Sequence, residues 1–110
     1  MTWLIRATTP THSFVIDIDP SLLKEILVTY KQGNKIVLEK HKADFIITSE
    51  TVQQKTVYVC SIKLTQEEAN LFSDGDVQIQ MRALSYDGNA YASNRINLGV
   101  EDVLNDEVLE

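Results

Sequence analysis

Apolar and polar residues alternate through most of the chain with a period of two, the spacing typical of β-strands that bury one face. The longest alternating stretch runs from Asp76 to Leu98 and is interrupted by Asp87-Gly88-Asn89. Because Asp-Gly between two alternating runs is a strong hairpin signal, this stretch predicts a long β-hairpin. Its predicted buried face consists of Val77, Ile79, Met81, Ala92 and Ile96.

Shorter runs before this hairpin predict further strands at residues 3–8, 12–18, 25–31, 35–40, 44–49 and 56–64. The first of these is expected to be an edge strand or an arm, because Pro10 soon interrupts it and cannot donate to a sheet ladder. The runs 25–31 and 35–40 flank Gln32-Gly33-Asn34 and predict a second hairpin.

Two helix-capping motifs interrupt the strand pattern. Asp19-Pro20 combines an N-cap residue with proline at the first helical position, which predicts a single helical turn. Thr65-Gln66-Glu67-Glu68 has the form of a capping box, in which Thr65 and Glu68 each accept a hydrogen bond from the other's backbone amide. It predicts one short helix between the strands at 56–64 and 76–84.

About seven strands with turn signals between them predict an all-β protein, and we expect an immunoglobulin-like β-sandwich. A small open barrel is the structural alternative. The immunoglobulin disulfide cannot form, because Cys60 is the single cysteine. We expect one β-sandwich domain over residues 1–99 and an acidic amphipathic C-terminal tail over residues 100–110.

The tail has a helical spacing of apolar residues at Val100, Val103, Leu104, Val108 and Leu109. Its acids fall partly near the C-terminal end, where the helix dipole disfavours them, so an isolated helix would be weak. Docking on a partner and a frayed, solvated terminus are the two alternatives. The acids Glu101, Asp102, Asp106, Glu107 and Glu110 carry most of the net charge of −6.

The remainder of the chain is almost neutral and has no basic stripe, so we expect no nucleic-acid partner. The opening MTWLIRATTP has only a short apolar run and an early arginine, which is unlike a signal peptide or a membrane span. We therefore expect no membrane partner, and synthesis and folding in the cytoplasm.

The sequence shows no reaction centre, and we predict a protein that is not an enzyme and that needs no cofactor or metal. His12 and His41 are far apart and have no spacing typical of metal ligands. Cys60 alternates with Tyr58 and Ile62, a pattern that favours a buried hydrophobic residue over a nucleophile.

Two sets of residues are candidate contact sites. The apolar residues of the two chain ends are expected to contact a neighbouring subunit: Trp3, Leu4, Val103, Leu104, Val108 and Leu109. The residues around the hairpin tip are candidate ligand contacts, since exposed aromatic rings stack on sugars: Tyr86, Asn89 and Tyr91. Aromatic residues that flank a hairpin turn also stabilise the hairpin itself, and this second interpretation stays open.

Several segments together resemble small proteins encoded by phages and prophages of Gram-positive bacteria. These segments are Arg6-Ala7-Thr8-Thr9-Pro10-Thr11-His12, Val28-Thr29-Tyr30-Lys31-Gln32-Gly33, Lys63-Leu64-Thr65-Gln66-Glu67-Glu68, Val77-Gln78-Ile79-Gln80-Met81-Arg82 and Glu107-Val108-Leu109. The resemblance runs along nearly the whole chain, and the pattern is similar to the N-terminal β-sandwich domains of upper baseplate proteins.

The resemblance implies a structural protein of the virion, from the tail or baseplate region, that acts by protein–protein assembly. Its partners would be other virion proteins and further copies of itself, and it would be found in the host cytoplasm during assembly and then in the virion. The matching motifs are structural, so the resemblance identifies no functional residues in this chain. The alternative function is a carbohydrate- or receptor-binding module that uses residues 86–91.

Overall fold

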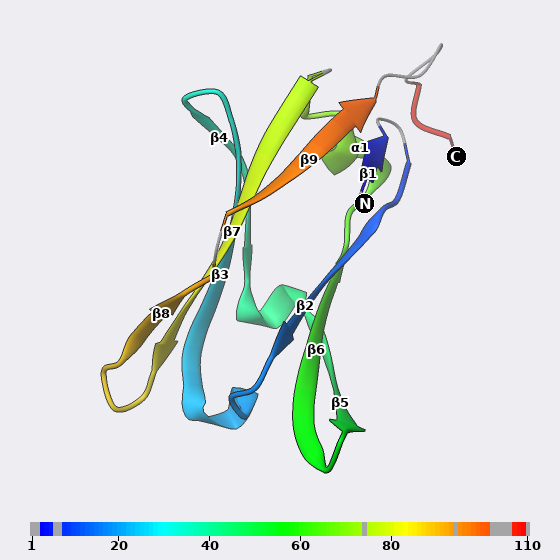
Figure 1. The fold of residues 1–110 in the computed structure, drawn as a ribbon. Helices are drawn as coiled ribbons and strands as arrows, with labels where there is room; N and C mark the ends of the chain where they lie inside the picture. The colour runs from blue at the N-terminus through cyan, green and yellow to red at the C-terminus, as the bar shows by residue number, and fades with distance from the viewer. Residues whose placement is uncertain (1–2, 6–7, 74, 94, 102–106, 110) are drawn as a thin grey trace.

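The computed structural model describes residues 3–5, 8–73, 75–93, 95–101 and 107–109 (Figure 1). The described strands are β1 (Trp3–Ile5), β2 (Thr11–Ile16), β3 (Leu23–Gln32), β4 (Lys35–His41), β5 (Ile46–Val52), β6 (Lys55–Lys63), β7 (Gly75–Ser85), β8 (Ala90–Ala92) and β9 (Ile96–Glu101). Short helical segments connect some of them: the 3₁₀ turns η1 (Pro20–Leu22) and η2 (Lys42–Asp44), and the helix α1 (Gln66–Ala69). None of the described helices is long and apolar enough to cross a membrane.

The strands form two sheets that pack face to face, as Figure 1 shows, and the prediction of an all-β sandwich is confirmed. The larger sheet has the order β1-β9-β7-β3-β4, with β8 also paired to β7, and the smaller sheet has the order β2-β6-β5. The part β9-β7-β3-β4 has the order of strands G-F-C-C′ in an immunoglobulin variable domain, and β2-β6-β5 has the order of strands B-E-D. No described strand pairs with the outer edge of β2.

The hairpin over residues 76–98 is present, but its returning strand is divided into β8 and β9, which both pair with β7. Ser93 lies at the division, where its backbone amide donates to the Met81 carbonyl and its hydroxyl accepts from the Met81 amide. The division helps to explain why the described strands exceed the seven that were expected.

The prediction of which residues form the inner face of this hairpin is partly wrong. Val77, Ile79 and Met81 are buried as expected. Ala92 pairs with Arg82 and so lies on the outer face, where it is exposed. Ile96 is 44% exposed because the next strand, β1, pairs only with Gly99 to Glu101 and leaves Ile96 at an open edge.

Both capping motifs form as the sequence predicts. The Thr65 hydroxyl accepts from the Glu68 amide at 3.1 Å, and a Glu68 carboxylate oxygen accepts from the Thr65 amide at 3.0 Å. The Asp19 carboxylate accepts from the Ser21 amide at 2.9 Å, which starts η1. These caps lie where the chain crosses from one sheet to the other, so they fix the connections between the two layers.

The core lies between the sheets and receives side chains from both. Ile26, Val28 and Tyr30 of β3 are fully buried and face Phe14 of β2 and Cys60 of β6. The core also includes Val100, which is 3% exposed and pairs with Leu4 in β1. The expected tail therefore does not begin as a helix at Val100, because β9 continues to Glu101.

Candidate functional site

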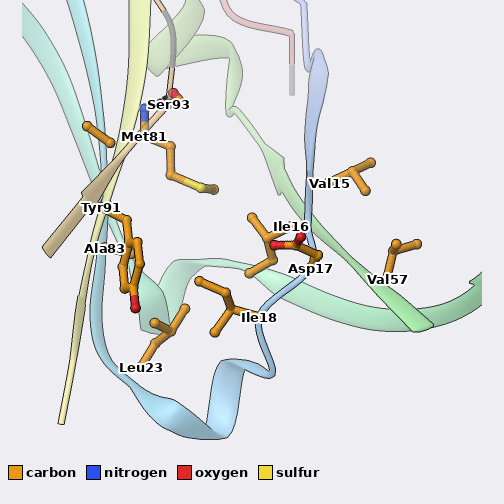
Figure 2. A pocket seen from close by; sticks show the side chains of 11 residues that line it. Val15, Ile16, Asp17, Ile18, Leu23, Val57, Met81, Ala83, Tyr91 and Ser93 are labelled. Atoms are coloured by element: carbon orange, nitrogen blue, oxygen red, sulfur yellow. Dashed lines mark hydrogen bonds between the residues drawn. The ribbon is translucent and has the colours of Figure 1, made fainter. Parts of the chain in front are cut away.

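An apolar groove of about 490 Å³ opens between the two sheets (Figure 2). Ile16 and Ile18 line it from the β2 side, and Met81, Ala83 and Tyr91 line it from the six-stranded sheet. Among the described strands, β2 pairs only with β6 and β8 only with β7, so two sheet edges border the groove. An edge strand presents unpaired backbone donors and acceptors, and the groove therefore combines an apolar floor with a hydrogen-bonding rim.

Few polar side chains reach this groove. Asp17 lies at the rim and pairs with Lys55, whose Nζ is 3.4 Å from the carboxylate oxygen Oδ2. Both side chains are about two-thirds exposed, so water screens this ion pair strongly. Ser93 also lines the groove, but its hydroxyl accepts from the Met81 amide. The groove thus suits an apolar segment or ligand better than a charged one.

The described residues contain no group of three or more metal-ligating side chains. Cys60 is fully buried, and burial raises the pKa of its thiol, so the reactive thiolate is disfavoured. His12 is also buried, and its Nδ1 lies 2.6 Å from the Tyr30 hydroxyl oxygen within the core. These groups stabilise the interior and do not face a substrate-sized opening.

The predicted tip residues take different positions. Tyr86 is 70% exposed, whereas Tyr91 pairs with Ala83 and faces the groove. The Asn89 side-chain amide donates to Asp87 at 3.3 Å and so belongs to the turn itself. The structure therefore makes Tyr91 a groove residue, while Asn89 serves the turn.

The turn at the tip is closed around Ser85. The Ser85 amide donates to the Asn89 carbonyl at 2.8 Å, and the Asn89 amide donates to the Ser85 hydroxyl at 3.0 Å. The Ser85 hydroxyl also donates to Asp87, and this hydrogen bond lowers the pKa of the Asp87 carboxyl. Three hydrogen bonds, two from backbone amides and one from the Ser85 hydroxyl, thus close the turn at the tip.

The predicted contacts at the N-terminal end need a correction. Leu4 is fully buried, because β1 pairs with β9 in parallel and turns this side chain into the core. It is therefore not an exposed assembly contact. The backbone of Trp3 pairs with Gly99 as part of the expected edge strand.

At the C-terminal end, the Gln66 side chain holds the backbone of Leu109. Its Nε2 donates to the Leu109 carbonyl at 3.0 Å, and its Oε1 accepts from the Leu109 amide at 2.8 Å. The Leu109 side chain stays 77% exposed, and Val108 is half-buried. Val103 and Leu104 lie outside the described residues. Gln66 could not be predicted as a contact residue, because a glutamine on a short helix has no local signature of such a contact.

Apolar side chains also gather on the outer face of the β2–β6–β5 sheet, which we call the aliphatic face. Val15 is 66% exposed and pairs directly with Val59. Ile46 is 73% exposed and pairs with Ser61, two residues from Val59 on the same strand. The opposite side of these strands carries the buried residues Phe14 and Cys60, so the aliphatic face points away from the core.

No protein-family model matches this chain, and no curated protein is similar enough to it to be a match. The resemblance described from the sequence therefore stays a prediction. Any function proposed for this chain must be supported by the surface of its structure.

Proposed function

We propose that this protein is a non-catalytic structural component that acts by binding other proteins, as part of the tail or baseplate region of a phage or prophage virion. The observation that carries the proposal is the aliphatic face. Val15 and Ile46 expose most of their surface beside Val59, on a regular sheet where outward positions are ordinarily polar. Exposed apolar surface of this kind marks protein–protein contact sites.

The edges of the small sheet support the same function. Its two outer strands, β2 and β5, each have one edge that no described strand pairs with. Virion proteins assemble as repeated, symmetric copies, for which sheet edges and flat sheet faces are suitable contacts. The proposed partners are other virion proteins and further copies of this chain. The virion assignment itself comes from the sequence resemblance. This resemblance implies that the protein is in the host cytoplasm before assembly.

Mass spectrometry of purified particles from a host that expresses the full chain tests this proposal. The unaltered chain is expected in the particles. A V15E/I46E variant is expected to be absent from them, although it should fold and be expressed as well as the unaltered chain. Leu71→Glu serves as the matched control, because Leu71 is 56% exposed but lies after α1, away from the aliphatic face. Absence of the unaltered chain from particles would overturn the virion assignment, and equal loss of the control variant would overturn the role of the aliphatic face.

A second candidate function is ligand binding in the groove, and the position of Tyr91 favours it. The Tyr91 ring lines the groove and is still 44% exposed, so one of its surfaces is accessible to a ligand. A glycan array probed with the full chain and with Tyr91→Ala tests this function. Saturable binding that Tyr91→Ala abolishes would support it, whereas binding to no glycan would leave the structural role as the better account.

A further inference from the structure

The outer face of the six-stranded sheet carries a concentration of positive charge in an acidic protein. A shallow depression of about 240 Å³ on this face is lined by Lys31 of β3, Arg82 of β7 and Arg95, which precedes β9. Thr29, Gln78 and Gln80 form the rest of its polar lining. We call these six residues the basic face. None of the described residues that line the depression carries a carboxylate, although the chain has a net charge of −6.

The strand register explains why these side chains share one face. Lys31 pairs with Gln78, and Thr29 pairs with Gln80. Their neighbours Tyr30 and Ile79 point the other way, into the core. The basic face is therefore a regular, outward surface of the sheet that β3 and β7 hold rigidly in place.

The three cations have no acidic partner within the described structure. The ion pairs that it contains join Lys40 to Glu68, His41 to Glu25 and Lys55 to Asp17, and none of them includes Lys31, Arg82 or Arg95. Glu39 is the carboxylate residue opposite Thr29 in β4, one strand away from the depression. Three neighbouring cations on one surface repel one another, so an anionic partner would relieve this repulsion.

The chain itself carries a segment of complementary charge. Residues 101–110 contain five acids and no base. Within this segment, the Leu109 backbone is held by Gln66 of α1 through two hydrogen bonds. The charge of the segment is opposite to that of the basic face.

We propose that the basic face binds the acidic C-terminal segment of a second copy of this chain. This inference rests on the proposed assembly function and names one contact through which copies would join. The contact is heterologous, because it pairs two different surfaces. Repetition of such a contact produces a ring if the rotation closes and an open filament if it does not.

A protein segment fits the basic face better than a polyanion does. Gln78 and Gln80 line the depression together with the cations. The Gln78 side-chain amide can both donate to and accept from the peptide groups of an extended segment. The Gln80 amide nitrogen already donates to the Ser93 carbonyl at 3.0 Å, but its amide oxygen can accept from the segment. A nucleic acid or a sulfated polysaccharide requires a longer array of cations to bind tightly. The basic face offers three, which matches a short acidic peptide.

Sedimentation of the full chain at low and high salt tests the contact. We expect self-association that weakens as salt rises, because salt screens exposed charges. R82E/R95E and, separately, D106K/E107K are each expected to weaken association about tenfold or more, as close charge pairs across an interface do. Lys24→Glu is the matched control, because Lys24 is an exposed cation of β3 outside the depression and should leave association unchanged.

The decisive test is to mix the two charge-reversed variants, R82E/R95E and D106K/E107K. Each variant alone should stay monomeric, and the mixture should form mixed oligomers, because the reversed face of one variant meets the reversed segment of the other and the unaltered face meets the unaltered segment. Failure of the mixture to associate, or self-association that neither reversal weakens, would overturn the inference. Binding of heparin by the basic face without any self-association would also overturn it, in favour of a polyanion ligand. Particle incorporation that depends on the aliphatic face is measured separately, so the proposed function can hold even if this contact does not exist.

Discussion

The Nδ1 atom of His12 and the hydroxyl oxygen of Tyr30 lie 2.6 Å apart inside an otherwise apolar core. His12 belongs to β2 and Tyr30 to β3, so this hydrogen bond joins the two sheets of the sandwich. The Tyr30 ring also packs between His12 and Phe72, at centroid distances of 5.6 and 5.7 Å. Burial raises the pKa of the Tyr30 hydroxyl, and the nearby charge of Glu68 raises it further, so the hydroxyl stays protonated.

Tyr30→Phe should destabilise the protein although the ring and its packing remain. The change removes the partner of a buried imidazole nitrogen, which costs about 1–3 kcal/mol of the free energy of unfolding. Urea denaturation followed by circular dichroism measures this loss. Tyr86→Phe is the control, because Tyr86 is 70% exposed and its loss of a hydroxyl should change stability little. Equal stability of Tyr30→Phe and the unaltered protein would show that the hydrogen bond contributes nothing.

Glu68→Gln should reduce the pH dependence of stability. Burial opposes the ionisation of Glu68, but hydrogen bonds from Lys40 and from the Thr65 amide outweigh it and lower the pKa of the carboxyl. A lowered folded-state pKa gives stability that is present above the unfolded-state pKa and is lost as the pH falls through the folded-state value. Denaturation measured from neutral pH down through the carboxyl range should show this loss in the unaltered protein and less of it in Glu68→Gln.

The control for that experiment is Glu67→Gln, which removes a neighbouring carboxylate that is exposed. It should keep the acid-dependent loss of stability. At neutral pH, Glu68→Gln should also be less stable by about 1 kcal/mol, because a charge-assisted hydrogen bond becomes a neutral one. An identical pH profile for the two variants would contradict the assignment to Glu68.

The turn between β5 and β6 should become more stable when Gln53→Asn and Gln54→Gly are combined. Both glutamines have positive φ values, 50° and 66°, a region that costs a residue with a side chain roughly 1 kcal/mol. Asn-Gly is the sequence that such a two-residue hairpin turn prefers. Thermal unfolding should show a higher midpoint, whereas Gln54→Val should lower it because a β-branched residue tolerates this region least. A midpoint that falls for the Asn-Gly variant would contradict the turn geometry.

The Cys60 thiol should react with a thiol reagent only when the protein unfolds. It is fully buried, and burial raises its pKa, so both access and thiolate formation are suppressed in the folded state. Reaction kinetics at increasing urea should follow the unfolded fraction. A Val15→Cys variant made together with Cys60→Ala supplies the exposed comparison and should react at once, since Val15 is 66% exposed. Rapid reaction of native Cys60 would show that the core opens locally.

Most of the local structure could be predicted from the sequence, because alternation and capping depend on residues close together in the chain. The Thr65 capping box and the Asp19 cap show this directly. The interpretation of Val100 was wrong for the opposite reason. Its apolar spacing fits both a helix and a strand, and the partners that decide for the strand are Leu4 of β1 and Gly75 of β7, both distant in the chain. A local pattern carries no information about these pairings.

The candidate sites were less predictable than the fold. The groove combines side chains from β2, β3, β6, β7 and β8, so no single segment of the sequence predicts it. Tyr91 was identified as a contact residue, but the strand register that turns it toward the groove depends on its pairing with Ala83. The basic face likewise depends on the alignment of β3 with β7, which places Lys31 and Arg82 on one surface.

The parallel pairing of β1 with β9 constrains the order in which the molecule can fold. Trp3 pairs with Gly99, so β1 leaves the ribosome long before its partner is synthesised. Contacts between residues so far apart in the chain are slow to form, because a large loop must close before they contribute. We therefore expect β1 to stay unpaired at least until β9 has been synthesised and to dock in a late step. Until that step, Leu4 and the edge of β9 are accessible to chaperones and to other nascent chains.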